Sequence, residues 1–268
     1  MRVALAQIQI EPGDIAENRE RAVAAVRAAA DCDLVVLPEL FDVGYFAFDS
    51  YARVAEGLDG ETLSAMSAVA AEAGVAVVAG TVVEDLAATA ERGVAPTPAP
   101  EGLANTAVVF DADGDRQLVY RKHHLFGYGS AEQELLTPGE RVPTAEVAGV
   151  TLGVTTCYDV RFPELYRDLV DQGAELIAVP SAWPYPRVEH WQLLPRARAV
   201  ENLVYVAAAN GVGEFDDATL LGRSTVYDPW GTVLAGSDDD PTLVTAEVDP
   251  ETVVATREEF PALADRRR

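Results

Sequence analysis

The sequence predicts one α/β domain with a mixed sheet, and three observations support this prediction. Continuous apolar runs, typical of strands buried on both faces, alternate with Ala-rich segments carrying Arg and Glu, typical of helices. Two turns rich in Asp and Gly lie between short β-forming runs and indicate inserted hairpins. No composition break and no internal repeat divides the 268 residues, so we expect a single domain over 1–268.

In the first half of the chain, predicted strands and helices alternate. The run at 3–8 alternates in hydrophobicity and 33–37 is continuously apolar up to Pro38, which indicates two strands. Ala-rich helices are expected at 18–30 and 61–73, and Gly74 ends the second. Another buried strand covers 75–83. The segment 85–103 has no periodicity, and we interpret it as an exposed loop.

The second half adds the hairpins. The turns at 111–115 and 228–231 are expected to join antiparallel strands, and Pro163 is typical of the first turn of a helix. The predicted elements are strands at 105–110, 117–121 and 152–156, a helix at 163–172, a strand at 176–179, a helix at 189–201, strands at 204–209, 223–227, 233–235 and 242–248, and an extended or helical arm at about 251–268.

The chain is strongly acidic. Its 44 Asp and Glu residues outnumber 20 Lys and Arg, which gives a formal net charge of -24, and Lys122 is the single lysine. Such a charge argues against a nucleic-acid or anionic-membrane partner. The hydrophobic content of 49% argues against disorder. The excess of acid with little lysine is typical of halophilic proteomes, and the alternative is a codon bias that favours Arg over Lys.

Cysteine usage and the N-terminus predict a cytoplasmic protein. Two cysteines, Cys32 and Cys157, cannot form a disulfide framework. The first residues enter an apolar alternation without the central hydrophobic region of a signal peptide. No stretch reaches the about 18 uninterrupted apolar residues of a membrane span.

Three reactive side chains, Glu39, Lys122 and Cys157, each follow a predicted strand. Strand ends are where open α/β sheets build their sites. Each residue also has an ordinary interpretation: a solvated turn glutamate, a surface cation and a small buried hydrophobe. Lys122 is unusual because Arg supplies every other basic charge, so a retained lysine indicates a role for a compact ammonium. A helix beginning near Pro163 would lower the pKa of the Cys157 thiol.

Together these side chains form a chemically consistent set. A cysteine nucleophile needs a base, and a carboxylate in a partly desolvated pocket, such as Glu39, can act as one. A tetrahedral intermediate needs donors for its oxyanion, which Lys122 and the backbone N–H of Tyr158 could supply.

The chain resembles the nitrilase superfamily of carbon–nitrogen hydrolases, which use a Glu-Lys-Cys triad. Three family motifs occur in order: Pro-Glu at 38–39, Arg-Lys-x-His-Leu-Phe at 121–126 and Cys-Tyr-Asp-x-Arg-Phe-Pro-Glu-Leu at 157–165. The resemblance implies a four-layer α-β-β-α sandwich with mixed sheets, and a homodimer or higher homo-oligomer built through helical layers. It also implies a supporting glutamate before a Pro-Gly turn; by offset from Gly139 this is Glu132, with Glu134 as the fallback.

The resemblance further implies an amidohydrolase that works through a thioester and needs neither a metal nor an organic cofactor. Tyr158 and Asp159 follow the nucleophile where true nitrilases resemble one another in having Trp, so the chain is more similar to the omega-amidase and deaminated-glutathione-amidase branch. A small linear carboxylate-amide is the first expected substrate, a carbamoyl amide the second and a nitrile the third. A catalytically silent binding or regulatory protein on the same fold is the alternative of another class.

Other candidate residues have simpler interpretations. His123, His124 and His190 are expected to pack or cap, and their spacing does not suit zinc. A papain-type set of Cys157, His124 and Asn210 stays open, although that family's local patterns are missing. Arg161 and Glu164 are expected to pair. Trp183 is as consistent with lining the pocket as with core packing, and Arg141 and Arg187 are candidates for binding a substrate carboxylate.

Overall fold

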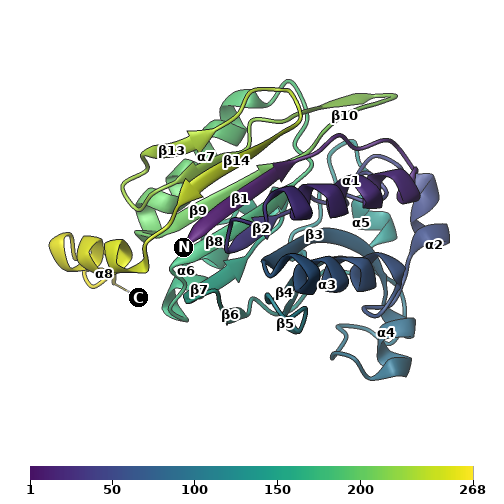
Figure 1. Ribbon diagram of the computed structural model, residues 1–268, viewed down its shortest axis with the longest axis horizontal. Helices are drawn as coiled ribbons and strands as arrows, with labels where there is room; N and C mark the ends of the chain where they lie inside the picture. Colours follow the sequence, from purple (N-terminus) through teal and green to yellow (C-terminus); the bar gives the residue numbers. More distant parts are fainter. Residues whose placement is uncertain (268) are drawn as a thin grey trace.

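In a computed structural model, which describes residues 1–267, the chain forms two six-stranded sheets that pack face to face (Figure 1). The first sheet has, in spatial order, β14 (Thr242–Glu247), β1 (Arg2–Gln7), β2 (Leu34–Val36), β3 (Ala76–Asp85), β4 (Leu103–Phe110) and β5 (Arg116–Arg121). The second has β13 (Val233–Gly236), β12 (Thr225–Tyr227), β9 (Tyr205–Asn210), β8 (Leu176–Ser181), β7 (Val150–Val154) and β6 (Thr144–Val147). Three central strands of each sheet are parallel and the outer ones antiparallel, so the predicted mixed sheets are confirmed.

Helices cover the outer face of each sheet. The longer helices are α1 (Ile15–Ala28) and α3 (Glu61–Ala73) over the first sheet, and α6 (Pro163–Asp171) and α7 (Val188–Asn202) over the second. The other helices are η1 (Phe48–Ser50), α2 (Tyr51–Val54), α4 (Leu86–Arg92), α5 (Glu132–Leu135), η2 (Cys157–Arg161) and α8 (Pro250–Glu259), which lies at one end of the molecule (Figure 1) and contributes Val253 to the cluster between the sheets. The expected α-β-β-α order of layers is confirmed.

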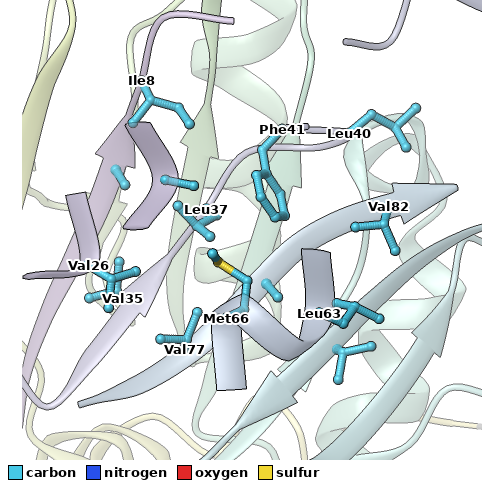
Figure 2. Packing of buried hydrophobic residues seen from close by; sticks show 14 of the residues in the cluster. Ile8, Val26, Val35, Leu37, Leu40, Phe41, Leu63, Met66, Val77 and Val82 are labelled. Carbon is cyan, nitrogen blue, oxygen red and sulfur yellow. The ribbon is translucent and has the colours of Figure 1, made fainter. Parts of the chain in front are cut away.

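Apolar side chains fill the three spaces between the four layers. Figure 2 shows part of the outer cluster, where Val26 of α1 and Met66 of α3 lie over Val35 and Val77 of the first sheet. A second cluster fills the space between the sheets, and a third packs α6 and α7 on the second sheet. Both faces of each sheet are therefore buried, which explains why the central strands are continuously apolar.

Several elements differ from the sequence prediction. The segment 85–103, predicted as an exposed loop, contains α4: Asp85 accepts a hydrogen bond from the Ala88 N–H at 3.0 Å, and Gly93 ends the helix in the left-handed region. Strand β6 was not predicted, and neither was the hairpin of β10 (Val212–Phe215) and β11 (Ala218–Leu221). The arm at 251–268 is mostly α8 up to Glu259, and its last residue, 268, lies outside the described part.

Strand direction brings the three candidate side chains to one edge. Glu39 follows β2 and Cys157 follows β7, both parallel strands. Strand β5 runs in the same direction as β3 because two antiparallel steps separate them, so Lys122 leaves the first sheet at the edge where Glu39 does. None of the helices formed by residues 1–267 is long and apolar enough to cross a membrane.

Candidate active site

Glu39 is held by a tight turn against β3. The carbonyl of Pro38 lies so close to Gly80 that a Cβ there would be 1.8 Å from its oxygen. Thr81 holds the residue after Glu39, because its Oγ1 accepts a hydrogen bond from the Leu40 N–H at 2.7 Å. Leu40 itself has a φ of 45°, in the left-handed region. A glycine at position 80 is therefore required for Glu39 to point inward, where it is fully buried.

Lys122 lies directly beyond β5. Its backbone N–H donates to the Asn105 carbonyl at 2.8 Å, and its own carbonyl accepts from the Gly139 N–H at 2.9 Å. A Cβ at Gly139 would be 2.1 Å from the Arg121 carbonyl oxygen, so the Pro-Gly turn can approach this strand end only without a side chain. The lysine side chain is completely enclosed.

Cys157 lies at the start of η2 with a φ of 47°, a left-handed conformation unusual for a non-glycine residue. The side chain of Asp159 stabilises this turn by hydrogen bonds. Its carboxylate accepts hydrogen bonds from the N–H groups of Thr156 at 3.0 Å and His124 at 2.8 Å, and from the Tyr120 hydroxyl at 2.6 Å. The turn therefore presents the thiol from a fixed backbone.

The Lys122 ammonium lies between two carboxylates. Its Nζ is 2.7 Å from Glu39 Oε1, and 2.8 and 2.9 Å from the two oxygens of Glu132. Glu132 Oε2 also accepts from the Tyr45 hydroxyl at 3.1 Å and the Phe126 N–H at 2.6 Å. Glu132 is fully buried, whereas the fallback Glu134 is exposed. The structure thus brings Glu132, and not Glu134, to the lysine.

Burial and mutual charge shift the pKa of Glu39, Lys122 and Cys157. Burial raises the pKa of Glu39, and the Lys122 charge only partly offsets this. Burial on its own would lower the pKa of Lys122, but the charges of Glu132 and Glu39 outweigh it and raise the pKa well above its usual value. Burial and the Glu39 charge raise the pKa of the Cys157 thiol well above its usual value. The expected lowering by a following helix is therefore wrong, because desolvation dominates.

Lys122 and Cys157 form part of the wall of a cavity of about 880 Å³. Aromatic rings make up much of the remaining wall, including Trp183, which is both pocket-lining and 3% exposed. Two guanidinium groups also line it: Arg161 lies 5.0 Å from the Trp183 ring centre, and Arg187 lies 5.7 Å from the Phe126 ring centre. The cavity thus joins a reactive thiol to an apolar wall with two cations.

Several other candidates lie elsewhere or have other partners. Arg161 contacts His190 at 3.1 Å and not Glu164, so the predicted ion pair is wrong; the aromatic wall holds the guanidinium instead. Arg141 is exposed and lies outside the cavity wall.

The papain-type set does not form a site. His124 Nδ1 lies 3.0 Å from Asp159 Oδ1, and its ring stacks on Phe162. The Asn210 side chain bonds the backbone at Trp183 and Gly222. Within residues 1–267, no three His, Cys, Asp or Glu side chains are arranged to hold a metal ion.

Sequence reasoning missed three residues of the cluster. Asn105, Tyr45 and Asp159 all bond to its members or to the nucleophile turn. The available signal was a polar side chain in an otherwise apolar setting, which for Asn105 is the buried strand β4.

Comparison with known proteins identifies the family. The model of the carbon–nitrogen hydrolase family matches residues 2–258. The 2-oxoglutaramate amidase of Paenarthrobacter nicotinovorans is 34% identical over 270 residues, covering 99% of this chain and 89% of that protein. The crystal structure of Nit3 from Saccharomyces cerevisiae, a member of branch 10 of the nitrilase superfamily, has a TM-score of 0.87 and 31% identity, covering 100% of this chain and 97% of the other.

A mutant of the amidase from Nesterenkonia sp. AN1 was solved after Michael addition of acrylamide to its active-site cysteine; its TM-score is 0.80 at 27% identity, covering 98% of this chain and 99% of that one. Family model, relatives and structures agree with the resemblance seen in the three motifs. The chain therefore belongs to the carbon–nitrogen hydrolase family, and it is a hydrolase of carbon–nitrogen bonds.

Proposed function

We propose that the protein is a cysteine-dependent amidohydrolase that converts a small carboxamide to an acid and ammonia through a thioester on Cys157. The observation that carries this proposal is the buried contact of Lys122 with Glu39 and Glu132 in a cluster that also reaches the Cys157 thiol. Lys122 and Cys157 both reach the cavity, where a substrate carbonyl would meet them together.

In the acylation half, Glu39 Oε2 takes the thiol proton while Sγ attacks the amide carbon. The carbonyl electrons move to oxygen, where the Lys122 ammonium and the Tyr158 N–H stabilise the negative charge. Among residues 1–267, the Tyr158 N–H donates to no backbone carbonyl outside η2, which leaves it for this role. Protonated Glu39 then gives its proton to the amide nitrogen, the C–N bond breaks, and ammonia leaves.

In the deacylation half, Glu39 accepts a proton from water as the water oxygen attacks the thioester carbon. The second tetrahedral intermediate expels the Cys157 sulfur, which recovers its proton from Glu39, and the acid is released. The raised pKa of Glu39 supports this double role, because a group that titrates closer to neutrality exchanges protons efficiently in both directions. Glu132 is a positioning residue that fixes the ammonium.

The cavity wall supports an amide that also carries a carboxylate. Arg161 and Arg187 are half-buried in this wall, and neither has a carboxylate within 4.0 Å among the described residues, although the chain has 44 acidic side chains. A substrate anion would find an unused cation here, while the aromatic rings would hold its carbon chain. The name of the 34% identical relative, 2-oxoglutaramate amidase, agrees with such a substrate.

The proposal also includes a homodimer and a cytoplasmic location. Leu193 and Val200 lie on the exposed side of α7, with 62% and 46% of their surface accessible. A symmetric assembly through the helical layer would bury both.

A substrate panel with a nucleophile variant tests the proposed function. Ammonia release is measured from succinamate and glutaramate, from butyramide as the uncharged analogue, from N-carbamoyl-β-alanine and from a nitrile. We expect the highest kcat/KM with the two carboxylate-amides, and mass spectrometry of acid-quenched enzyme should find the acyl group on Cys157. Preference for the carbamoyl compound or the nitrile would replace the amide assignment.

Cys157→Ala should abolish release from every substrate with an unchanged circular dichroism spectrum. Cys32→Ala is the matched control, because this second buried cysteine lies outside the cavity and should leave turnover intact. Turnover by the Cys157→Ala protein would contradict the nucleophile assignment. Absence of ammonia from every compound would favour the silent binding protein.

A further inference from the structure

The side chain of Asn105 links both carboxylates of the cluster. It lies in β4 and is 1% exposed. Its Nδ2 donates to Glu39 Oε1 at 2.8 Å and to Glu132 Oε1 at 3.1 Å. These are the same oxygens that Lys122 Nζ contacts at 2.7 and 2.8 Å. Each of these two oxygens therefore accepts from a neutral amide as well as from the lysine ammonium.

The Asn105 amide can adopt one orientation only. Nδ2 carries two hydrogens and no acceptor, so both of its partners must be oxygens without a proton in that direction. The reversed amide would place Oδ1 against two carboxylate oxygens, which repel it. In the present orientation Oδ1 has no hydrogen-bond partner among the described residues, although it is buried. An unpartnered buried acceptor is unfavourable for stability. The amide keeps this orientation because its Nδ2 group donates to both carboxylates, even though its Oδ1 atom then has no donor.

The two oxygens of Glu39 consequently differ. Oε1 receives donors from Lys122 and Asn105, and a proton placed there would oppose both. Oε2 accepts from the Ala182 N–H at 3.0 Å, and the carboxylate also interacts with the Cys157 thiol. We propose that Asn105 is a positioning residue that keeps Glu39 Oε1 unprotonated and so directs the thiol proton to Oε2. This inference rests on the proposed function, in which Glu39 is the base.

The pKa of Glu39 depends on the charged and titratable groups around it. These are Lys122 after β5, Glu132 in α5, Cys157 in η2 and the Tyr45 hydroxyl in the loop after β2. Asn105 adds two donors without adding a charge. Because hydrogen bonds to the ionised form favour that form, removing these donors raises the pH at which Glu39 gains its proton. The acid limb of any reaction that needs ionised Glu39 should therefore move to higher pH.

The test measures the rate of Cys157 alkylation by iodoacetamide against pH, with the modified residue identified by mass spectrometry, beside kcat and KM for the best amide. In Asn105→Leu, which keeps the size and removes both donors, the acid limb should move up by about one pH unit. The kcat should fall by about 10-fold or more. KM should change little, because Asn105 is not part of the cavity wall.

Asn105→Asp gives a second test if the leucine variant does not fold. An ionised carboxylate at position 105 would be repelled by the carboxylates of Glu39 and Glu132. The new carboxyl group should therefore stay protonated, and it offers one hydrogen-bond donor in place of two. The acid limb should again move up. Thr106→Val is the matched control: this neighbour in β4 is equally buried, and its hydroxyl bonds Glu84 at 2.6 Å, away from the cluster. It should lower the midpoint of thermal unfolding and leave the acid limb in place.

The outcomes separate this inference from the proposed function. Folded Asn105 variants whose acid limb coincides with that of the wild type would overturn the role of Asn105 while the Glu39 base survives. An equal shift in Thr106→Val would also overturn it, because general destabilisation would then suffice. A wild-type protein with no acid limb would overturn the proposed function and this inference with it.

Discussion

At the scale of single residues, the lone lysine is the most informative feature of the chain. Arg supplies 19 of the 20 basic side chains, yet the fully enclosed cationic position holds Lys122. An ammonium is a compact charge with three donors, which suits three carboxylate oxygens converging on one point at 2.7 to 2.9 Å. A planar guanidinium presents its donors in a fork, so it would push the two carboxylates apart.

We predict that Lys122→Arg lowers kcat by about 10²–10³-fold, although the charge is retained, because the oxyanion then loses a correctly placed donor. Steady-state ammonia release measures this loss. Lys122→Met, of similar size and without charge, should lose at least as much. Near-normal turnover by the arginine variant, with folding verified by circular dichroism, would contradict the proposed oxyanion role.

The sequence could predict some of these residues and not others for a physical reason. Glu39, Lys122 and Cys157 could be predicted because each follows a strand directly, and strand direction determines where strand ends meet. Asn105 could not, because its contacts depend on the register of β4 against β3 and β5, and no local pattern encodes that register. The expected pair of Arg161 with Glu164 was wrong, because stacking on aromatic rings competes with local charge pairing.

At the scale of elements, the nucleophile turn is the part of the fold with the most specialised backbone. Asp159 joins it to two other segments, since its carboxylate accepts from the Tyr120 hydroxyl in β5 and from the His124 N–H beyond it. The same carboxylate closes the turn on the Thr156 N–H. The left-handed backbone at Cys157 is therefore held in part by β5, the strand that Lys122 follows.

We predict that Asp159→Asn lowers kcat by about 10–100-fold with a smaller change in KM, because an amide nitrogen would replace one acceptor and loosen the turn. Kinetics with the best amide measure the effect. Asp111→Asn is the matched control: its carboxylate likewise closes a turn by accepting from the N–H groups of Asp113 and Asp115, far from the cavity. Equal loss of kcat in both variants would contradict a specific role for Asp159.

Elements themselves were predictable where periodicity or turn chemistry was strong. The central strands and both hairpin turns, 111–115 and 228–231, appear where the sequence predicts them. Helix α4 was missed because its seven residues precede a segment rich in Pro, and the aspartate that caps it is equally typical of a turn. The β10–β11 hairpin was missed because two aspartates, Asp216 and Asp217, occupy its turn without a glycine signal.

At the scale of the whole molecule, the two sheets share a core. Residues from β1, β2 and β3 pack between the sheets against residues from β7, β8 and β9. The site depends on this contact, since Glu39 and Lys122 belong to the first sheet and Cys157 to the second. We propose that the described chain is one cooperative folding unit, as expected from the sequence, because separating the sheets would expose the inner cluster and dismantle the site.

A cavity made on the outer face of the first sheet tests this unit from its far side. Met66 of α3 is fully buried in the outer cluster of Figure 2, whereas Trp183 and Trp191 lie in the cluster over the second sheet. Met66→Ala should cost about 2–5 kcal/mol of stability. That loss corresponds to roughly 4–20 °C in the midpoint of thermal unfolding, at about 2–4 °C per kcal/mol for a large domain.

If the chain unfolds as one unit, the tryptophan fluorescence and circular dichroism midpoints of Met66→Ala should fall together, because the distant indoles report the same transition. Ala68→Ser, an exposed position on the same helix, is the control and should change stability by less than about 0.5 kcal/mol. A fluorescence midpoint that stays at the wild-type temperature while the circular dichroism midpoint falls would divide the molecule into two units. In that case the edge where Glu39, Lys122 and Cys157 meet would be an interface between domains.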